Sequence, residues 1–141
     1  IVRVLAPGGR AVITAWHPTG AISEAGMLLR QALMELSGGP PRPPPPWGDP
    51  AQVVALFAPH GARVTSTDSS LRFEAPSAEA WFAEQQDHHP VWRFAERALS
   101  SRPGAWASLR ERSIAALEAG NEAPGAFRVT SGYSIYEVRA R

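Results

Sequence analysis

Cysteine is absent from the 141 residues, which excludes disulfide bonds, a thiolate nucleophile and any zinc site built on cysteine. Lysine is absent as well, so all 14 basic side chains are arginine. The formal net charge is only +1, which gives no electrostatic reason to expect a nucleic acid or a membrane surface as a partner. We therefore expect no nucleic acid and no membrane among the partners.

Long hydrophobic runs are also missing, since no apolar stretch approaches the ~20 residues that a membrane-spanning helix needs. The first residues lack the basic start and the apolar core of a signal peptide. Together these two features predict a cytoplasmic protein. The chain begins with Ile1 and with the tail of a helix, which predicts that it starts within a domain.

Several motifs with a defined chemical role do not occur. There is no Gly-x-Gly triplet, and therefore no glycine-rich loop that would let the backbone approach a nucleotide closely. A serine nucleophile elbow, a phosphate loop and a metalloprotease motif are missing too. Asp87, His88 and His89 are adjacent, but helical neighbours diverge by about 100° and no fourth ligand is evident, so we predict no metal site.

The most informative stretch that is present covers residues 3–18. Pro7-Gly8 predicts a turn, because proline stops a helix and glycine accepts a positive φ without a steric penalty. Residues 11–16 are apolar and rich in β-branched side chains. Such a run predicts a strand buried on both faces within a parallel sheet, with the carboxyl edge of the sheet at residues 16–18.

The rest of the chain alternates between helical and strand patterns. Apolar residues at three- and four-residue spacing predict a helix over residues 22–36, which ends at Ser37-Gly38-Gly39. Capping residues predict two more helix starts, at Asp49 and at Ser77. The remaining expectations, in order, are a strand at 62–67, a second strand or its continuation at 71–75, three helices between 77 and 120, and a last strand over 127–139.

The proline-rich segment over residues 40–48 has two interpretations. Its prolines lack backbone donors and favour an extended polyproline II path. It is either a stiff connector or a ligand for an SH3-type or WW-type domain. We prefer the connector, because ordered elements are predicted on both sides of it.

The string Arg3-Val4-Leu5-Ala6-Pro7-Gly8-Gly9-Arg10, followed by an apolar strand, resembles the fifth-strand region of class I S-adenosylmethionine (SAM)-dependent methyltransferases. The later pattern, with Trp47-Gly48-Asp49-Pro50 and a last strand ending in arginine, is similar to the C-terminal half of that family. The resemblance implies an α/β fold, namely the C-terminal part of a Rossmann-like seven-stranded methyltransferase sheet with helices, whose N-terminal SAM-binding strands are missing. Residues 1–141 would then form a partial methyltransferase domain with a turn and core strand (1–18), a helix (19–39), the proline-rich connector (40–48) and C-terminal helices and strands (49–141).

Four residues are candidates for the substrate side of such a protein. Open α/β sheets bind ligands beyond the carboxyl ends of their strands, which is where Trp16 and His17 are expected. His17 is the candidate catalytic base for a hydroxyl or amine acceptor, because imidazole titrates near neutrality. Trp16 and Trp47 could wall an apolar or cationic substrate pocket, and Met27 is a further candidate substrate contact, although core packing also explains these apolar residues.

Two functions follow from these features. The first is the substrate-side portion of a SAM-dependent methyltransferase acting on a small molecule, with SAM as the cofactor of the complete protein. Because the glycine-rich loop is missing, we predict no cofactor-binding residue in this chain, weak SAM binding or none by it, and no activity of it alone. The alternative is a non-enzymatic α/β ligand-binding or assembly domain without cofactor. A homodimer through an open sheet edge is a further expectation, since an unpaired edge favours association.

Overall fold

The computed structural model describes residues 1–38 and 45–140, and its contacts divide the chain into two compact units. Each unit is assembled from segments that are distant in the sequence. Unit 1 consists of Ile1–Pro18, Pro43–Leu71 and Gly132–Arg141, and unit 2 consists of Thr19–Arg42 and Arg72–Ser131. Within the described residues the protein has three strands and five α-helices, which confirms the α/β class.

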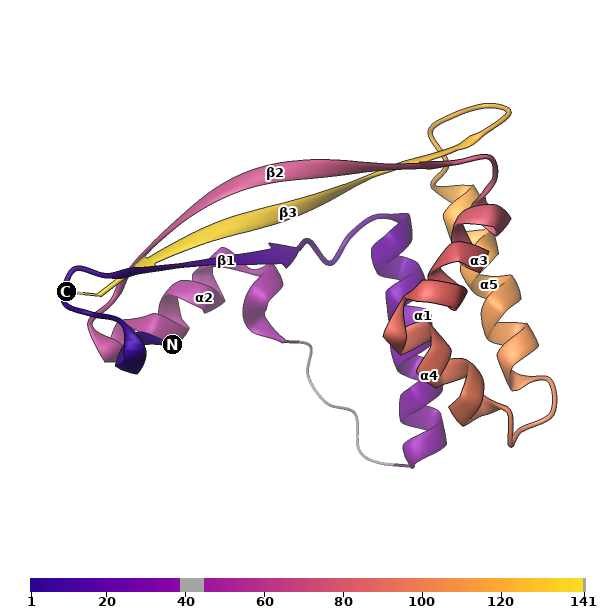
Figure 1. Ribbon diagram of the computed structural model, residues 1–141, viewed down its shortest axis with the longest axis horizontal. Helices are drawn as coiled ribbons and strands as arrows, with labels where there is room; N and C mark the ends of the chain where they lie inside the picture. Colours follow the sequence, from indigo (N-terminus) through magenta and orange to yellow (C-terminus); the bar gives the residue numbers. More distant parts are fainter. Residues whose placement is uncertain (39–44, 141) are drawn as a thin grey trace. The chain divides into compact units, whose positions relative to one another are not determined.

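The sheet has the strand order β1-β3-β2 and is antiparallel (Figure 1). β1 (Arg10–Trp16) belongs to unit 1, whereas β2 (Arg63–Ala75) and β3 (Phe127–Arg139) contribute residues to both units. β1 and β3 run in continuous register from the pair Arg10 and Arg139 to the pair Trp16 and Tyr133. The predicted strands at 62–67 and 71–75 are one continuous strand, β2.

The turn that leads into β1 is confirmed. Gly9 N–H donates to the Ala6 carbonyl over 2.8 Å, and Gly8 has φ of 72°. Proline at the second position and a glycine with positive φ at the third position are the residues that a type II turn requires. The turn follows a short 3₁₀-helix, η1 (Val2–Val4), so the helix ends before Pro7 as predicted.

The expectation that β1 is buried on both faces within a parallel sheet is wrong. β1 pairs with β3 in the antiparallel sense, and its residues alternate between exposed and half-buried along the strand. Val12, on the outer face, is 59% exposed. An apolar run indicates a strand but carries no information on the direction of its neighbour, which is decided by residues more than a hundred positions away.

A small core in unit 1 covers the inner face of this sheet. α2 (Pro50–Phe57) places Val53 and Phe57 against Tyr136 and Val138 of β3, and all four are buried (Figure 1). The helix begins where predicted, because the Asp49 carboxylate accepts from Ala51 N–H at 2.9 Å. One layer of helix on one face leaves the other face of the strands to solvent.

A larger core lies in unit 2, among four helices that Figure 1 shows side by side. These are α1 (Ala21–Ser37), α3 (Ala78–His88), α4 (Pro90–Leu99) and α5 (Ala105–Ala119). The predicted helix over 22–36 is confirmed as α1, which ends at Gly38 with φ of 63°. Ser77 caps α3 as predicted, by accepting from Ala80 N–H at 3.0 Å.

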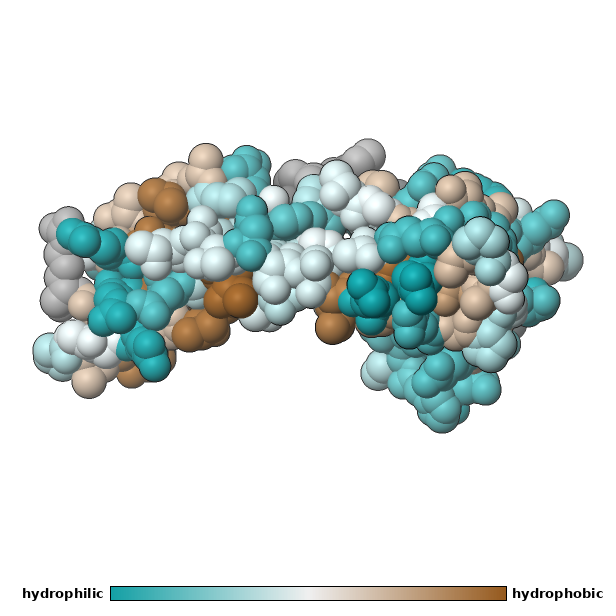
Figure 2. All heavy atoms as spheres, turned by 90° about the horizontal axis from the view of Figure 1, so that it is seen from above, coloured by the Kyte–Doolittle hydropathy of each residue, from teal (hydrophilic) through white to brown (hydrophobic). Residues whose placement is uncertain are grey.

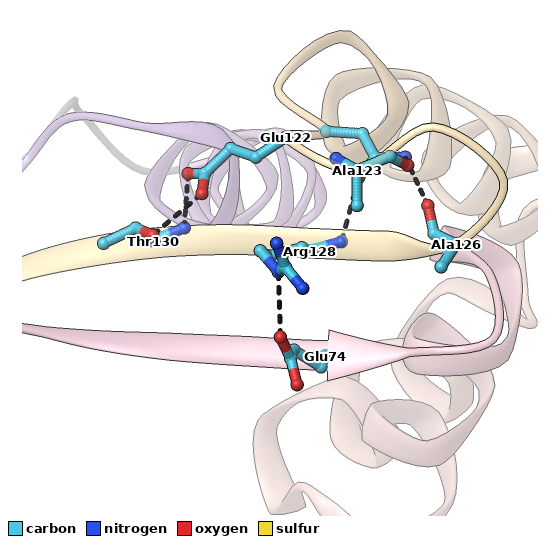
Figure 3. Close-up of polar contacts among 7 residues, drawn as sticks. Glu74, Glu122, Ala123, Ala126, Arg128 and Thr130 are labelled. Carbon is cyan, nitrogen blue, oxygen red and sulfur yellow. Dashed lines mark hydrogen bonds and ion pairs between the residues drawn. The ribbon is translucent and has the colours of Figure 1, made fainter.

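Polar contacts anchor the start of β3 within unit 2 (Figure 3). The Glu122 carboxylate accepts from both the backbone N–H and the hydroxyl of Thr130, at 2.7 and 2.9 Å. The Arg128 side chain donates to Glu74 of β2 over 2.8 Å, and its backbone N–H donates to Asn121 over 2.9 Å. The loop between α5 and β3 is therefore held to the strand by its own side chains.

The proline-rich connector predicted over 40–48 lies partly outside the described residues, which resume at residue 45. The described part ends in a 3₁₀-helix, η2 (Pro46–Gly48), immediately before the cap of α2. None of the helices formed by residues 1–38 and 45–140 is long and apolar enough to cross a membrane.

Candidate functional site

A pocket of about 440 Å³ lies in unit 1, at the carboxyl end of β1. The strand contributes the floor, and η2 together with the first turn of α2 contributes a wall. The lining side chains are mostly apolar, with two indoles and three prolines: Thr14, Ala15, Trp16, Pro18, Pro45, Pro46, Trp47, Gly48, Asp49 and Gln52. Its volume falls within the range typical of pockets for small molecules.

Trp16 reaches the pocket because it is the last residue of β1 and lies on the exposed face of the strand. Its ring meets that of Tyr133 edge to face, with the centroids 5.5 Å apart. The side chain is nevertheless 54% exposed. An indole that packs against an aromatic neighbour and still has half of its surface open to solvent offers a ready surface to a ligand.

Two contacts fix the position of Trp47. Its ring packs against Phe57 in the small core, with the centroids 6.5 Å apart, and its carbonyl accepts a hydrogen bond from the buried Tyr136 hydroxyl at 2.8 Å. Gly48 follows and lies close to the end of β1, since an added Cβ would come within 3.0 Å of Pro18 Cδ. The wall that carries Trp47 is thus fixed to the strand by close packing.

Asp49 is the charged residue of the lining. One carboxylate oxygen accepts from Ala51 N–H and the other from the Gln52 amide, each at 2.9 Å. The hydrogen bond from Gln52, followed by that from the Ala51 backbone, lowers the pKa of Asp49 from its usual value. The carboxylate is therefore ionised at neutral pH.

A second, smaller pocket of about 300 Å³ lies in the same unit, lined by Thr14, Ala15, Trp16, Leu71 and Tyr133. Trp16 therefore borders two hollows. On the face drawn in Figure 2, hydrophobic residues (brown) form small groups between hydrophilic ones. Exposed hydrophobic side chains occur in both units, among them Val12, Trp16 and Leu71 of unit 1 and Met27 and Phe94 of unit 2.

His17 directly follows β1 and belongs to a polar cluster with residues from the middle of β2 and β3. Its Nε2 lies 3.0 Å from the Ser134 hydroxyl oxygen, and that hydroxyl donates to Asp68 of β2 over 2.8 Å. The distance from His17 Nε2 to the Asp68 carboxylate is 3.5 Å. Ser134 and Asp68 therefore both approach the same ring nitrogen, Nε2.

The direction of these hydrogen bonds fixes the tautomer of His17. Ser134 has one hydroxyl proton and gives it to Asp68, so its oxygen accepts from His17 Nε2. Nδ1 then carries the lone pair of the neutral ring, and it lies against Gly132, where an added Cβ would come within 2.6 Å. The role of His17 as a general base remains a prediction, and Nδ1 is the atom that would take the proton.

Sequence reasoning missed Asp68 and Ser134. Ser134 is buried, whereas the Asp68 side chain is 69% exposed, so neither would be found from hydrophobic periodicity. The polar run around Asp68, beside a predicted strand, was the one local signal. The pairing of Ser134 with residues near His17 follows from the β1 and β3 register.

The structure therefore brings together two of the four predicted site residues. Trp16 and Trp47 line the same pocket, whereas the described lining of that pocket does not include His17. Met27 lies on α1 in unit 2, where it is exposed and lines a pocket of about 370 Å³ with Glu24 and the end of α5. A role for any of the four in substrate binding or catalysis remains a prediction.

That this chain supplies no SAM-binding residue stays a prediction. The glycine in the pocket lining, Gly48, uses its missing side chain to approach Pro18, so it does not form a cradle for a ligand. No Gly-x-Gly loop occurs in the sequence to supply a cradle elsewhere.

The adjacent histidines near residue 88 are placed at helix ends. His88 is the last residue of α3, and His89 caps α4, since its Nδ1 accepts from Val91 N–H at 3.3 Å. Within the described part of the chain, no group of three or more histidine, cysteine, aspartate or glutamate side chains is placed to hold a metal ion.

Comparison of the chain with models of protein families gives no match, and comparison with curated proteins gives none either. Its function is therefore inferred from its residues and from the geometry of the two units.

Proposed function

We propose that this chain is the C-terminal, substrate-side portion of a SAM-dependent methyltransferase that acts on a small molecule. The observation that carries the proposal is the pocket at the carboxyl end of β1, directly after the Pro7-Gly8 turn and strand that resemble the methyltransferase pattern. In a mostly parallel α/β sheet, which the proposal assigns to the complete protein, ligands bind beyond the carboxyl ends of the strands. In this proposal Trp16 and Trp47 hold and orient the acceptor.

The antiparallel order of the strands is compatible with a larger sheet. Many α/β proteins carry an antiparallel strand at the margin of an otherwise parallel sheet. β1 lies at one edge of the described sheet, and its exposed Val12 offers apolar surface to a further layer. The seven-stranded Rossmann-like arrangement is part of the proposal, with the SAM-binding strands supplied by another part of the complete protein.

SAM would be the methyl donor of the complete protein and would be held outside the residues described here. The contribution of this chain is then to bind the acceptor, exclude water with its apolar lining and fix the orientation of the reacting group. His17 stays the candidate base for an acceptor that must lose a proton. Ser134 and Asp68 hold its ring, but the described lining of the pocket does not include it and its Nδ1 lies against Gly132, so the acceptor would have to reach it from outside this pocket.

The test compares this chain with a longer protein that includes its upstream coding sequence. Isothermal titration with SAM is expected to show binding by the longer protein and none by the 141 residues alone. In the longer protein, Trp16→Ala should lower kcat/KM for an acceptor by about tenfold, roughly 1.4 kcal/mol, through lost aromatic packing, and should leave SAM affinity unchanged.

The control for that variant is Phe94→Ala, which removes an exposed aromatic ring from α4 in unit 2. Micromolar SAM binding by the 141 residues would contradict the assignment of this chain to the substrate side. A longer protein that fails to bind SAM would favour the non-enzymatic alternative.

The second candidate function is a ligand-binding or assembly domain without cofactor. It is favoured by the edge position of β1, because an edge strand with exposed apolar side chains can pair with a second copy. In that case the chain is a homodimer through the open sheet edge, and its molar mass in solution should be twice that of the monomer.

A further inference from the structure

We propose that the pocket between Trp16 and Trp47 takes a small organic ammonium ion, a cationic amine or quaternary ammonium group attached to an apolar body. The inference concerns binding to this chain alone and does not rest on the proposed function, because a quaternary or protonated nitrogen has no lone pair and is not itself a methyl acceptor. Three properties of the lining favour such a ligand: the sign of its charge, its free hydrogen-bonding capacity and its aromatic surface.

The negative charge of the pocket lining favours a cationic ligand. Among the described residues that line the pocket, Asp49 alone is charged and none is arginine or histidine. From these residues an anionic ligand would meet a carboxylate and no basic side chain. A carboxylate, phosphate or sulfate ligand is therefore disfavoured.

Asp49 keeps the capacity to bind a donor. Each of its oxygens accepts one hydrogen bond from the protein, from Ala51 or from Gln52, and an ionised carboxylate has about four acceptor positions. Those two hydrogen bonds also hold the carboxylate in a fixed orientation. A charged N–H group of a ligand could therefore bind without displacing the helix cap.

The two indoles supply the rest of the recognition. A cation over an indole face is attracted by the ring quadrupole, and tryptophan is the most effective of the aromatic residues in this role. Trp16 is largely exposed and Trp47 packs against Phe57, so one ring is accessible and the other is held in place. The prolines at 18, 45 and 46 add apolar surface for the body of the ligand without adding charge.

The test uses choline and its neutral isostere 3,3-dimethylbutan-1-ol, which differ in charge but hardly in shape. Binding to the 141-residue chain is followed by tryptophan fluorescence and by the NMR shifts of the indole N–H groups, with Trp16→Phe used to assign one of them. We expect choline to bind about tenfold more tightly than the neutral isostere, the discrimination that one cation–π contact of about 1.4 kcal/mol provides.

Asp49→Asn is the informative variant, because asparagine caps a helix as well as aspartate but carries no charge. It should weaken choline binding by about threefold to fivefold, the loss of one ionic contact at an exposed site, and leave the neutral isostere unaffected. The matched control is Asp87→Asn, which removes an exposed carboxylate from α3 in unit 2. Because the Asp49 pKa is lowered, choline binding should not change between about pH 5 and pH 8.

Equal affinity for the two ligands, binding of the neutral one alone, or no binding of either would overturn the inference. So would an Asp49→Asn variant that binds choline as tightly as the parent chain. These outcomes are separate from those of the SAM titration. If a longer protein binds SAM but this chain does not bind choline, only the ammonium-ligand inference is refuted. If this chain binds choline but the longer protein does not bind SAM, only the methyltransferase proposal is refuted.

Discussion

Unit 2 and unit 1 differ in how much of their surface they bury. Among the described residues, the core of unit 2 contains twelve buried residues, with rings from Trp81, Phe82, Trp92 and Phe127, whereas the core of unit 1 contains four. The two pockets that adjoin Trp16 both belong to unit 1. We therefore expect unit 2 to contribute more to stability, and the binding surface that we propose lies in unit 1.

The largest expected effect tests the core of unit 2. Phe82 is fully buried, and its ring lies 4.9 Å from Trp92 and 6.2 Å from Trp106, centroid to centroid. Phe82→Ala should lower the free energy of unfolding by about 3–5 kcal/mol through lost burial and the cavity left behind. Urea unfolding followed by circular dichroism measures it. For Phe94→Ala on the exposed side of α4, the free energy of unfolding should stay within about 0.5 kcal/mol of the parent value. Equal losses in the two variants would contradict the view that the buried core of unit 2 carries the stability.

The second-largest effect is expected in the polar cluster of His17, Ser134 and Asp68 in unit 1. Gly132→Ala places a Cβ within 2.6 Å of His17 Nδ1, so the imidazole must leave its hydrogen bond with Ser134. We expect a loss of about 1–3 kcal/mol in the free energy of unfolding. The double variant Gly132→Ala with His17→Ala should recover part of this loss, because the clash partner is gone. A purely additive cycle would show that the imidazole does not occupy this space in solution.

A somewhat smaller effect tests the support of the pocket wall. Tyr136→Phe removes the buried hydroxyl that donates to the Trp47 carbonyl and should cost about 1–2 kcal/mol, since the acceptor loses its partner. It should also raise the Kd for choline by loosening Trp47. Tyr133→Phe removes the same atom from a half-buried residue beside Trp16 and is the matched comparison. Identical stabilities of the two variants would contradict the role given to the Tyr136 hydroxyl.

A gain in stability is expected in unit 2. Ser113 on α5 is fully buried, and its hydroxyl has no hydrogen-bond partner among the described residues. Ser113→Ala should raise the free energy of unfolding by about 1 kcal/mol, because it removes the desolvated hydroxyl and improves helix propensity. Thermal unfolding measures the change. A destabilised variant would mean that the hydroxyl is satisfied in solution.

The smallest effect on stability is expected for a substitution on β1, the edge strand in unit 1. Val12→Lys places a charge on the exposed face of β1 and should change the free energy of unfolding by no more than about 0.5 kcal/mol. It should shift any homodimer through this edge to monomer, because lysine on an edge strand opposes pairing. Light scattering after gel filtration separates the two states. A dimer that survives the substitution would place the interface elsewhere.

Much of the local structure could be predicted from the sequence. The turn at Pro7-Gly8, the cap at Asp49, the cap at Ser77 and the end of α1 at Gly38 all follow from neighbouring residues. These features depend on backbone conformations and capping groups within a few positions. Such signals do not need the rest of the fold to be known.

The candidate site was only half predictable. The chemistry of Trp16 and Trp47 predicts a shared pocket, which they do line, whereas the same argument predicts Met27, which lies in the other unit. The sequence does not predict Asp68 and Ser134, because no local motif distinguishes them from other polar strand residues. What marks them is their distance from His17, which a linear pattern does not contain.

Caps, turns and apolar periodicity act over a few residues, so the positions of the helices and of most strands follow from local sequence. The antiparallel pairing of β1 with β3 depends instead on the folded chain. The folded chain also brings Ser134, 117 positions after His17, into the cluster around the imidazole. Strand pairing joins residues far apart in the chain, and its direction depends on the whole sheet.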